Sequence, residues 1–323
     1  MVNAQRRKKM IKKISVIGAG TMGHGIASAF ARFGYEVSIY ESFESVRLTC
    51  KDKVKSIYDF FVKEGVMSHE KLVESLNNIE VFDDLKKSVC DADYVIEAIP
   101  EKLELKQELL DNLVKFCKKN TVFASNTSSL PFNKLTEKLS VEDKKRVMVC
   151  HWYNPPHLIP LVELSHFGNM PKEVYEEVRE LYISIEKKPA KVLKDVPGLL
   201  ANRIQQGVAR EVFSLMANGV GDAEDIDIAL KYGPAFRYAT TGQLEVADFG
   251  GLDIWAVVGD NLLSVMDNSK EASPLLREKV KEGKLGFKSG EGFFKYPDET
   301  KQEVLDKFYK KLLKQLEVSK NYD

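Results

Sequence analysis

The strongest constraint on the fold is an apolar segment that runs directly into a glycine-rich turn. Residues 13–17 are mainly apolar and β-branched, and the pattern G-x-G-x-x-G follows at once. Apolar residues then recur at helical spacing up to Phe33. This order predicts a strand, a tight turn and a helix. In such a turn Gly18 permits the sharp bend, Gly20 lets a pyrophosphate approach the backbone, and Gly23 lets the helix pack closely on the strand.

An acidic residue stands at the distance from this turn that dinucleotide-binding folds use. A second predicted strand, at 36–40, is followed directly by Glu41, about 20 positions after the glycines. A carboxylate there hydrogen-bonds the adenosine ribose hydroxyls and repels a 2′-phosphate. An ordinary glycine turn between a strand and a helix would explain the glycines but not the acid. We therefore expect the turn to bind the pyrophosphate of NAD rather than NADP.

Length and charge limit the classes of protein that fit. The chain has 323 residues, enough for two domains, and its 48 basic residues balance 48 acidic ones. A net charge of zero provides no field that attracts nucleic acid or an anionic membrane. No apolar run reaches the roughly 18 residues of a membrane span, and no signal-peptide segment is present. We expect a cytoplasmic protein without a nucleic-acid or membrane partner.

Neither the cysteines nor the basic N-terminal residues indicate a special site. The four cysteines are far apart and form no C-x-x-C motif, so we expect neither a metal site nor disulfides, but four small buried residues in a reducing compartment. The basic cluster at 6–9 is interpreted as a solvated leader rather than a phosphate contact. The cysteines are Cys50, Cys90, Cys117 and Cys150.

Strand and helix patterns alternate as far as residue 195. This alternation predicts an α/β fold, with a Rossmann-type, doubly wound and mainly parallel sheet. Residues 44–79 are too long for a simple crossover and predict a helical hairpin that stands off the sheet. Further helices are predicted at 103–116 and 174–185. The strands are expected at 13–17, 36–40, 79–81, 93–99, 121–125, 146–150, 161–164 and 190–193.

The pattern changes at Pro197 and Gly198, where strand signals nearly vanish. A separate all-α domain is therefore expected, so that 1–195 form the NAD-binding domain and 196–323 a helical domain for substrate binding and dimerisation. Its predicted helices cover 199–218, 222–232, 242–267, 272–282 and 302–316. A homodimer through this domain is expected, because its first helix is apolar on more than one face. The apolar residues are Leu199, Ile204, Val208, Val212, Leu215 and Met216.

One histidine is well placed to take a proton during hydride transfer. Oxidation of an alcohol needs a base, and the pKa of free histidine lies near neutrality. His151 follows the predicted strand 146–150, at the end of the sheet where ligands bind. Glu163 is a single acid within an apolar strand, and a buried carboxylate requires a partner. A carboxylate bonded to one ring nitrogen fixes the tautomer and stabilises the imidazolium.

Six segments of the chain, in order, resemble the L-3-hydroxyacyl-CoA dehydrogenase family, which includes 3-hydroxybutyryl-CoA dehydrogenases. Singly the segments are not specific, but together they are. The resemblance covers residues 13 to about 296. The segments are 16–23, 95–101, 125–130, 151–155, 161–164 and 197–203.

The resemblance implies roles for five residues. His151 corresponds to the catalytic base and Glu163 to the acid that orients it. Asn202 corresponds to an asparagine near the reacting oxygen, Ser128 to a serine that bonds the substrate's 3-oxygen, and Asn154 to an asparagine that supports the pair. Ser128 as a helix cap and Asn154 as a turn residue before proline remain alternatives.

The resemblance also implies the cofactor contacts. It places Glu41, Glu101, Asn126 and Lys106 against NAD, although a solvated helix lysine remains the alternative for Lys106. The remaining cofactor-binding residues lie in the matching motifs. They are Gly18, Gly20, Thr21, Met22, Gly23, Ala98, Ile99 and Ser128.

The reaction that the resemblance implies is hydride transfer between NAD and a short-chain (S)-3-hydroxyacyl-CoA, as in fatty-acid β-oxidation and butanoate metabolism. Three departures bear on the substrate. Glu41 is followed by Ser42 rather than an amide or arginine, and no lysine in 51–64 aligns with the family's contact to the CoA nucleotide. Residues 233–238 are bulkier than in many members and resemble dehydrogenases of free acids, such as gulonate and carnitine. A non-CoA 3-hydroxy acid and a non-catalytic NAD-binding protein are the alternatives.

Overall fold

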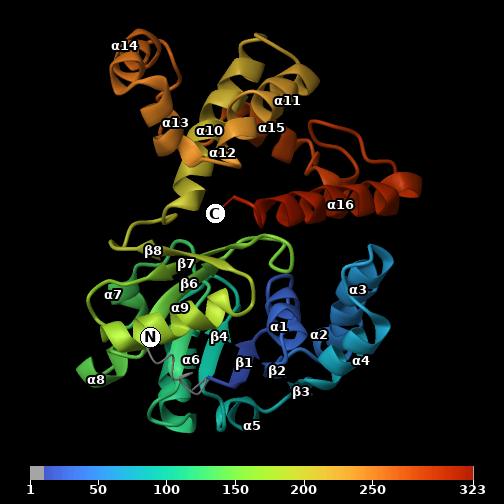
Figure 1. Ribbon diagram of the computed structural model, residues 1–323, viewed down its shortest axis with the longest axis vertical. Coiled ribbons are helices and arrows are strands. Elements are labelled where there is room, and N and C mark those ends of the chain that lie inside the picture. The colour runs from blue at the N-terminus through green and yellow to red at the C-terminus, as the bar shows by residue number, and fades with distance from the viewer. Residues whose placement is uncertain (1–10, 323) are drawn as a thin grey trace, which may run out of the picture. The chain divides into compact units, whose positions relative to one another are not determined.

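One sheet of eight strands organises the first part of the chain (Figure 1). The computed structural model describes residues 11–322, so the basic cluster at 6–9 lies outside the described residues. The strand order is β3-β2-β1-β4-β5-β6-β7-β8. The strands are β1 (Lys13–Ile17), β2 (Glu36–Tyr40), β3 (Ile79–Phe82), β4 (Tyr94–Glu97), β5 (Val122–Ser125), β6 (Val147–Trp152), β7 (Leu161–Ser165) and β8 (Lys188–Val192).

The strand pairing confirms the predicted mainly parallel, doubly wound sheet. The strands from β3 through β6 pair in parallel, β7 runs antiparallel to β6, and β8 is parallel to β7. The order reverses at β1, whose neighbours are β2 and β4. Ile17 at the end of β1 pairs with Tyr40 and Glu97, so three carboxyl ends are level at this switch point. Ligands of open α/β sheets bind at such a point.

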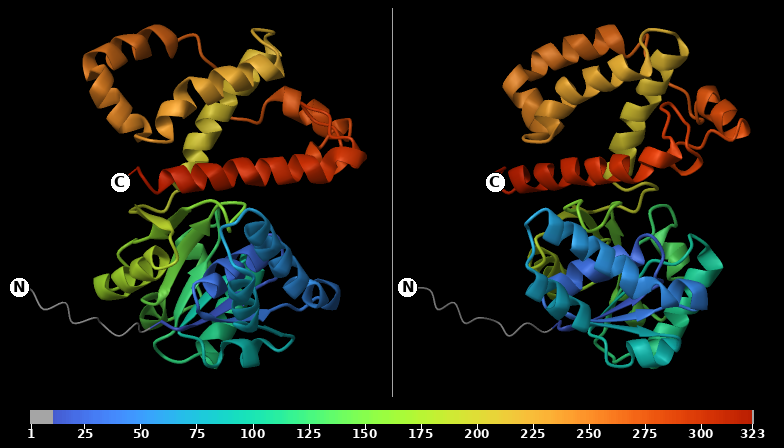
Figure 2. Two further views of the ribbon diagram at one scale, coloured as in Figure 1. Left: turned by 45° about the vertical axis from the view of Figure 1, so that its right-hand side comes forward. Right: turned by 90° about the vertical axis from the view of Figure 1, so that its right-hand side faces the viewer.

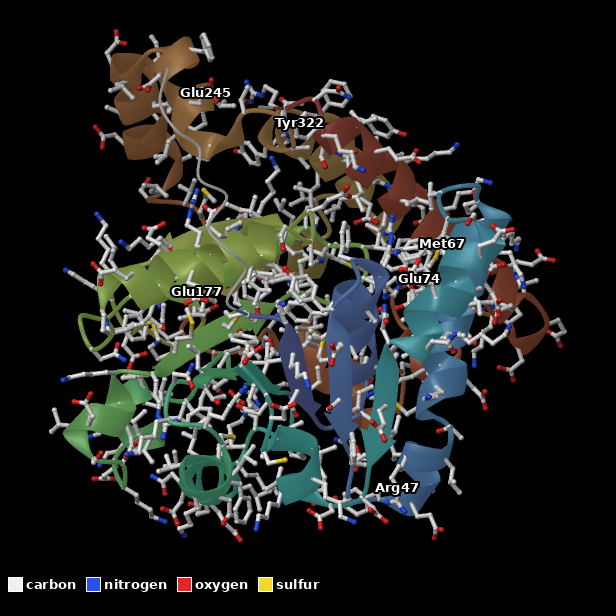
Figure 3. All side chains as sticks on the ribbon, turned by 60° about the horizontal axis from the view of Figure 1, so that its bottom comes forward. Arg47, Met67, Glu74, Glu177, Glu245 and Tyr322 are labelled. Atoms are coloured by element: carbon white, nitrogen blue, oxygen red, sulfur yellow. The ribbon has the colours of Figure 1, made fainter. Side chains whose placement is uncertain are left out.

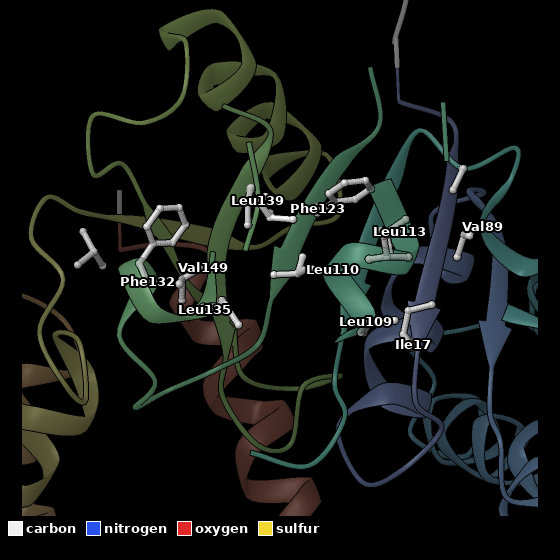
Figure 4. Close-up of a cluster of buried hydrophobic side chains, with 14 of the residues drawn as sticks. Ile17, Val89, Leu109, Leu110, Leu113, Phe123, Phe132, Leu135, Leu139 and Val149 are labelled. Carbon is white, nitrogen blue, oxygen red and sulfur yellow. The ribbon is translucent and has the colours of Figure 1, made fainter. Parts of the chain in front are cut away.

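Helices cover both faces of the sheet (Figure 2), and alternating strand residues supply a core on each. On one face Phe30 packs against Tyr94, Trp152 and Tyr182. On the other, Val149 belongs to an apolar cluster with side chains from α6 and α7 (Figure 4). The helices of this part are α1 (Gly23–Arg32), α2 (Glu44–Leu48), α3 (Cys50–Lys63), α4 (His69–Asn77), α5 (Leu85–Val89), α6 (Leu103–Phe116), α7 (Phe132–Leu135), α8 (Val141–Lys144) and α9 (Lys172–Ile183).

The inserted hairpin of α3 and α4 exists as predicted, and it packs mainly on helix α1. Its apolar side packs against α1, and the Tyr58 hydroxyl donates a 2.8 Å hydrogen bond to the Ser28 carbonyl. Met67 is buried in the turn between the two helices (Figure 3). Ser68 caps α4 by accepting from the Lys71 N–H, as its position before the helix predicts. The packing of the hairpin on α1 was not predicted, and it follows from the apolar stripe of α3.

The chain divides into two units between Leu200 and Ala201, whereas the sequence placed the boundary after 195. The difference has a physical reason: Leu199 is buried in the core of the first unit, so the segment after Pro197 still packs there. The second unit is helical, as predicted. Its helices are α10 (Ala201–Ala217), α11 (Ala223–Tyr232), α12 (Pro234–Tyr238), α13 (Gly242–Gly250), α14 (Leu252–Leu262), α15 (Pro274–Lys281) and α16 (Lys301–Ser319).

Two local predictions were wrong. The helix predicted over 242–267 is two helices, because Gly251 adopts a φ of +89° and ends α13. Cys90 is exposed rather than buried, since it follows the last turn of the short surface helix α5, while the other three cysteines are at least half-buried. All four thiols are free. Between residues 11 and 322, no helix combines the length and apolarity that a bilayer crossing needs.

Candidate active site

The glycine turn after β1 has the geometry of a phosphate-binding turn. Gly18 adopts a φ of +95°, and a Cβ there would lie 2.9 Å from the Ala98 carbonyl oxygen. A Cβ at Gly23 would lie 1.7 Å from the Gly18 oxygen, so α1 starts in contact with the turn. Gly20 has no atom within 4 Å of its Cβ position, and Met22 begins α1 without a side-chain cap. The exposed backbone N–H groups therefore fit a dinucleotide pyrophosphate.

Glu41 is fixed beside this turn by the backbone. Its carboxylate accepts from the Ala19 N–H at 2.8 Å and from the Phe43 N–H at 2.9 Å. Arg47, labelled in Figure 3, donates to the Glu41 carbonyl at 3.1 Å. A carboxylate offers about four acceptor sites, so about two remain for hydroxyl donors such as those of a ribose.

A buried ion-pair network connects the ends of β4 and β5. Lys106 of α6 is 1% exposed, and its ammonium lies 2.7 Å from a Glu97 oxygen and 3.1 Å from Glu101. Ser125 also donates to the Glu97 carboxylate, which accepts from the Ile99 N–H at 3.1 Å. Burial raises the pKa of Glu97, and the Lys106 charge opposes that rise. Lys106 is therefore not the solvated helix lysine of the alternative interpretation.

Glu101 holds the polar turn that follows β5. One oxygen accepts from Thr127 Oγ1 at 2.5 Å, from Ser129 Oγ at 2.9 Å and from the Ser128 N–H at 3.1 Å. Burial alone would raise the pKa of Glu101, but the Thr127 hydrogen bond and the Lys106 charge outweigh it and lower that pKa to about 2. The carboxylate is thus ionised at neutral pH and fixes the backbone on either side of Ser128.

The turn containing Ser128 borders a cavity of the first unit. Residues 127–131, 195–197 and Leu199 line it together with Val149 of β6. The Ser128 carbonyl accepts from the Gly198 N–H at 2.8 Å, which joins the two segments. The cap of α7 is Pro131, so Ser128 is not a helix cap. Asn126 lies two residues before Ser128, and its side-chain oxygen accepts from the Trp152 N–H at 2.8 Å.

His151 and Glu163 form a buried pair at the centre of this edge. The two residues are direct partners in the antiparallel pairing of β6 and β7. His151 Nδ1 lies 2.8 Å from Glu163 Oε2, and the side chains are 8% and 0% exposed. The other Glu163 oxygen accepts from the Leu200 N–H at 2.8 Å. When Nδ1 carries the proton and donates to the carboxylate, Nε2 is the nitrogen that can accept another.

The surroundings of the pair are aromatic and partly shielded from water. The Tyr153 ring meets His151 edge-to-face at 5.4 Å. Burial, followed by the negative charge of Glu163, raises the pKa of Tyr153. Val149 and His151 lie on the same face of β6, because strand side chains alternate. The imidazole therefore faces the side of the sheet that carries the cavity.

One predicted residue, Asn154, makes no described hydrogen bond to the pair. Asn154 is exposed and precedes Pro155 through a cis peptide bond, and no described hydrogen bond of His151 involves it. Its alternative as a turn residue fits this position. Asn202 lies in the first turn of α10, in the second unit. Within residues 11–322, no group of three or more His, Cys, Asp or Glu side chains is arranged to hold a metal ion.

Sequence reasoning missed the residues that act through others. Thr127 and Ser129 hold Glu101, Ser125 bonds Glu97, and the Leu200 N–H satisfies Glu163. The run of small polar residues at 125–129 was the available signal for the first three. A backbone N–H from a residue 37 positions away has no sequence signal at all.

The glycine turn, the acid after β2 and the buried His–Glu pair define an NAD-dependent dehydrogenase. The NAD binding domain of the 3-hydroxyacyl-CoA dehydrogenase family matches residues 13–196, and the C-terminal domain of that family matches residues 198–296. The chain belongs to the 3-hydroxyacyl-CoA dehydrogenase family, and its cofactor is NAD.

Three relatives illustrate the range within this family. A 5-formyl-3-hydroxy-2-methylpyridine 4-carboxylate 5-dehydrogenase from Mesorhizobium japonicum is 33% identical over 90% of this chain and 93% of its own. The crystal structure of such an enzyme, an NAD⁺-dependent dismutase, matches with a TM-score of 0.87 and 30% identity over 97% of this chain and 100% of its own. An (S)-3-hydroxybutyryl-CoA dehydrogenase from Ralstonia eutropha matches with a TM-score of 0.71 and 30% identity over 89% and 100%.

The low pKa of Glu101 predicts a pH-dependent contribution to stability. A carboxyl group whose pKa is lowered in the folded state stabilises it above the ordinary value of 4.5, and this is lost as the pH falls through about 2. Glu101→Gln should therefore lower the free energy of unfolding at pH 7 by about 1 kcal/mol, a value discounted because the side chain is partly exposed. Urea unfolding at pH 7 and pH 3 should show the difference shrinking at the lower pH.

Glu108→Gln is the matched control, because Glu108 is an exposed acid on α6, the helix that begins just after Glu101. It should change the free energy of unfolding by less than about 0.5 kcal/mol at either pH. A Glu101→Gln difference that is the same at both pH values would contradict the ionised, hydrogen-bonded role of Glu101.

Proposed function

We propose that this enzyme interconverts a short-chain (S)-3-hydroxyacyl-CoA, such as 3-hydroxybutyryl-CoA, and the 3-oxoacyl-CoA, with His151 as the base. The supporting observation is the 2.8 Å contact between His151 Nδ1 and Glu163 Oε2, in which both side chains are buried. A role in fatty-acid β-oxidation or butanoate metabolism is part of this proposal.

The chemistry assigned to the pair follows from its hydrogen bonds. Bound NAD supplies the hydride acceptor. His151 takes the 3-hydroxyl proton on Nε2, because Nδ1 is committed to Glu163. Glu163 stabilises the imidazolium that results and is itself held by the Leu200 N–H. In the reducing direction the same nitrogen returns the proton.

Ser128 and Asn202 are proposed to hold the reacting oxygen, and Asn154 to support the pair. The hydrogen bonds that Glu101 accepts favour this role for Ser128, since they fix the turn that contains Ser128. For the cofactor, the open glycine turn and the remaining acceptor sites of Glu41 support pyrophosphate and ribose binding. Glu101, Lys106, Asn126, Ala98 and Ile99 complete the proposed contacts, with Lys106 acting through Glu97 and Glu101.

A substrate without CoA is the second candidate. The match to the pyridine-carboxylate dehydrogenase has a TM-score of 0.87 and covers all of that chain, against 0.71 for the 3-hydroxybutyryl-CoA dehydrogenase. Helix α12 replaces the short turn typical of many members, and its aromatic residues Phe236 and Tyr238 are bulkier. These observations support a compact carboxylic acid as the second candidate substrate.

The helical unit is proposed to form a homodimer and to contribute to substrate binding, as expected for 196–323. Helix α14 is apolar along most of its length and no residue of it is buried. Ile254 and Val257 are 57% and 60% exposed. A mainly apolar helix with no buried residue requires cover, and a second copy provides the same surface through two-fold symmetry.

A substrate panel run with base variants tests the proposed reaction. Acetoacetyl-CoA, acetoacetate, dehydrocarnitine and 5-formyl-3-hydroxy-2-methylpyridine 4-carboxylate are each assayed by NADH absorbance, with NADPH in parallel. The enzyme should turn over acetoacetyl-CoA with NADH, and His151→Gln should lower kcat by about 100-fold to 10,000-fold, because proton transfer is lost. Turnover of a free acid but not of acetoacetyl-CoA would contradict the first proposal and support the second candidate.

His69→Gln is the control, because His69 is exposed at the start of α4. It should leave kcat unchanged. Full turnover by His151→Gln would refute the base assignment, and the absence of turnover with every compound would favour a non-catalytic NAD-binding protein.

Sedimentation velocity at micromolar concentration tests the proposed dimer. The wild type should sediment as a dimer, and Val257→Glu should dissociate it because a charge would be buried in an apolar contact. Val141→Glu, on the exposed helix α8 of the first unit, should remain dimeric. A wild-type monomer would contradict the proposal.

A further inference from the structure

Lys187 is a buried cation that the proposed chemistry does not use. It lies between α9 and β8 and is 7% exposed. Its ammonium donates to the carbonyls of Pro156 at 2.6 Å and Ile159 at 2.7 Å, and lies 4.8 Å from the centroid of the Trp152 ring. None of the described ion pairs includes a carboxylate for it. A buried charge is costly, so its two carbonyl acceptors and the aromatic face must compensate.

The backbone before Lys187 is arranged to turn this side chain inward. Glu186 adopts a φ of +60°, an unfavourable conformation for a residue that is not glycine. The Lys187 N–H then bonds back to the Tyr182 carbonyl at 3.0 Å, which ends α9. Burial, with a smaller effect from the charge of Arg32, lowers the pKa of Lys187 to about 7. A neutral amine still has two N–H donors, so Lys187 can donate to both carbonyls whether it is protonated or neutral.

The two carbonyls belong to the segment 153–160 that joins the strand of His151 to the strand of Glu163. Within it, the N–H groups of Leu158 and Ile159 bond to the Pro155 carbonyl at 3.1 and 3.0 Å. Lys187 therefore ties two points of a tight turn to the start of β8. The length of this turn decides which residue of β7 stands opposite His151.

The same segment also contacts the helix of the glycine turn. A Cβ at Gly25, in the first turn of α1, would lie 2.5 Å from Pro156 Cγ. Pro156 is thus in close contact with α1 on one side, while its carbonyl is bound by Lys187 on the other. His157, the next residue, meets the Phe61 ring of α3 edge-to-face at 6.0 Å. The position of Pro156 therefore links the proposed cofactor turn to the proposed base.

We propose that Lys187 is a positioning residue that holds Pro156 against α1 and so sets the distance between His151 and the cofactor-binding turn. The expected kinetic effect rests on the proposed function. The contacts of Lys187 with Pro156 and Ile159 are present without substrate. Loss of the two hydrogen bonds should loosen the 153–160 segment and the first turn of α1 together. A displacement of about 1 Å between base and cofactor lowers a rate by about 100-fold.

Amide hydrogen exchange of the protein without ligands tests the contact. In Lys187→Met, which keeps the apolar stem and removes the donors, the amides of Leu158, Ile159 and Ile26 should exchange about 10-fold faster. Amides in β1 and β5 should not change. Lys172→Met is the matched control, because Lys172 is exposed at the start of α9, and it should alter none of them. Unchanged exchange at Ile26 would overturn the proposal.

Kinetics of the same variants separate positioning from general stability. With acetoacetyl-CoA and NADH, kcat of Lys187→Met should fall about 10-fold to 100-fold, and the primary isotope effect from NADH deuterated at C4 should rise, because hydride transfer becomes limiting. A variant that is merely less stable shows neither change once folded. If Lys187→Met does not fold, Lys187→Gln, whose amide nitrogen is one bond short of the ammonium position, is measured in the same way and should show the same changes. Wild-type kcat and isotope effect in the folded variant would overturn the proposal, whereas full activity of His151→Gln would overturn only the assignment of the base.

Discussion

The buried contact between His151 and Glu163 is the interaction on which the site depends. Glu163 has no exposed surface, and an ionised carboxylate in such a place must be fully satisfied. It is satisfied by the imidazole on one oxygen and by the Leu200 N–H on the other. The reversal of strand direction at β7 makes this possible, because antiparallel pairing places the two residues directly opposite each other. The sheet thus departs from the parallel pattern between β6 and β7, the strands that contain His151 and Glu163.

The rest of the edge is built to keep polar groups fixed near this pair. Lys106 pairs with the buried Glu97 and the partly exposed Glu101, and Glu101 in turn orders the turn that carries Ser128. Each charge is paired or hydrogen-bonded, so the network is rigid. A site on the ends of buried strands gains precision because those strands cannot shift without disturbing the core on both faces.

The sequence predicted the fold well where a pattern is local and repeated. The strand before Gly18, the acid after β2 and the pairing of His151 with Glu163 all followed from spacing and from the cost of burying a charge. The surroundings of Lys106 and Lys187 could not be predicted in this way. Both appear as ordinary lysines in a chain with 48 basic residues, and only tertiary packing shows that they are buried. The break at Gly251 was missed because the apolar spacing continues across it. The packing of α3 on α1 was missed because an apolar stripe on a helix does not show which element it packs against.

The tautomer of His151 decides whether Nε2 is free to accept the substrate proton. Nitrogen-15 NMR of the labelled protein, with His151→Gln to assign the signals, reports which ring nitrogen carries the proton when the imidazole is neutral. The account predicts a protonated Nδ1 and an unprotonated Nε2, with this preference lost in Glu163→Gln. A proton on Nε2 in the wild type would contradict it, because the nitrogen assigned to accept the substrate proton would then already be occupied.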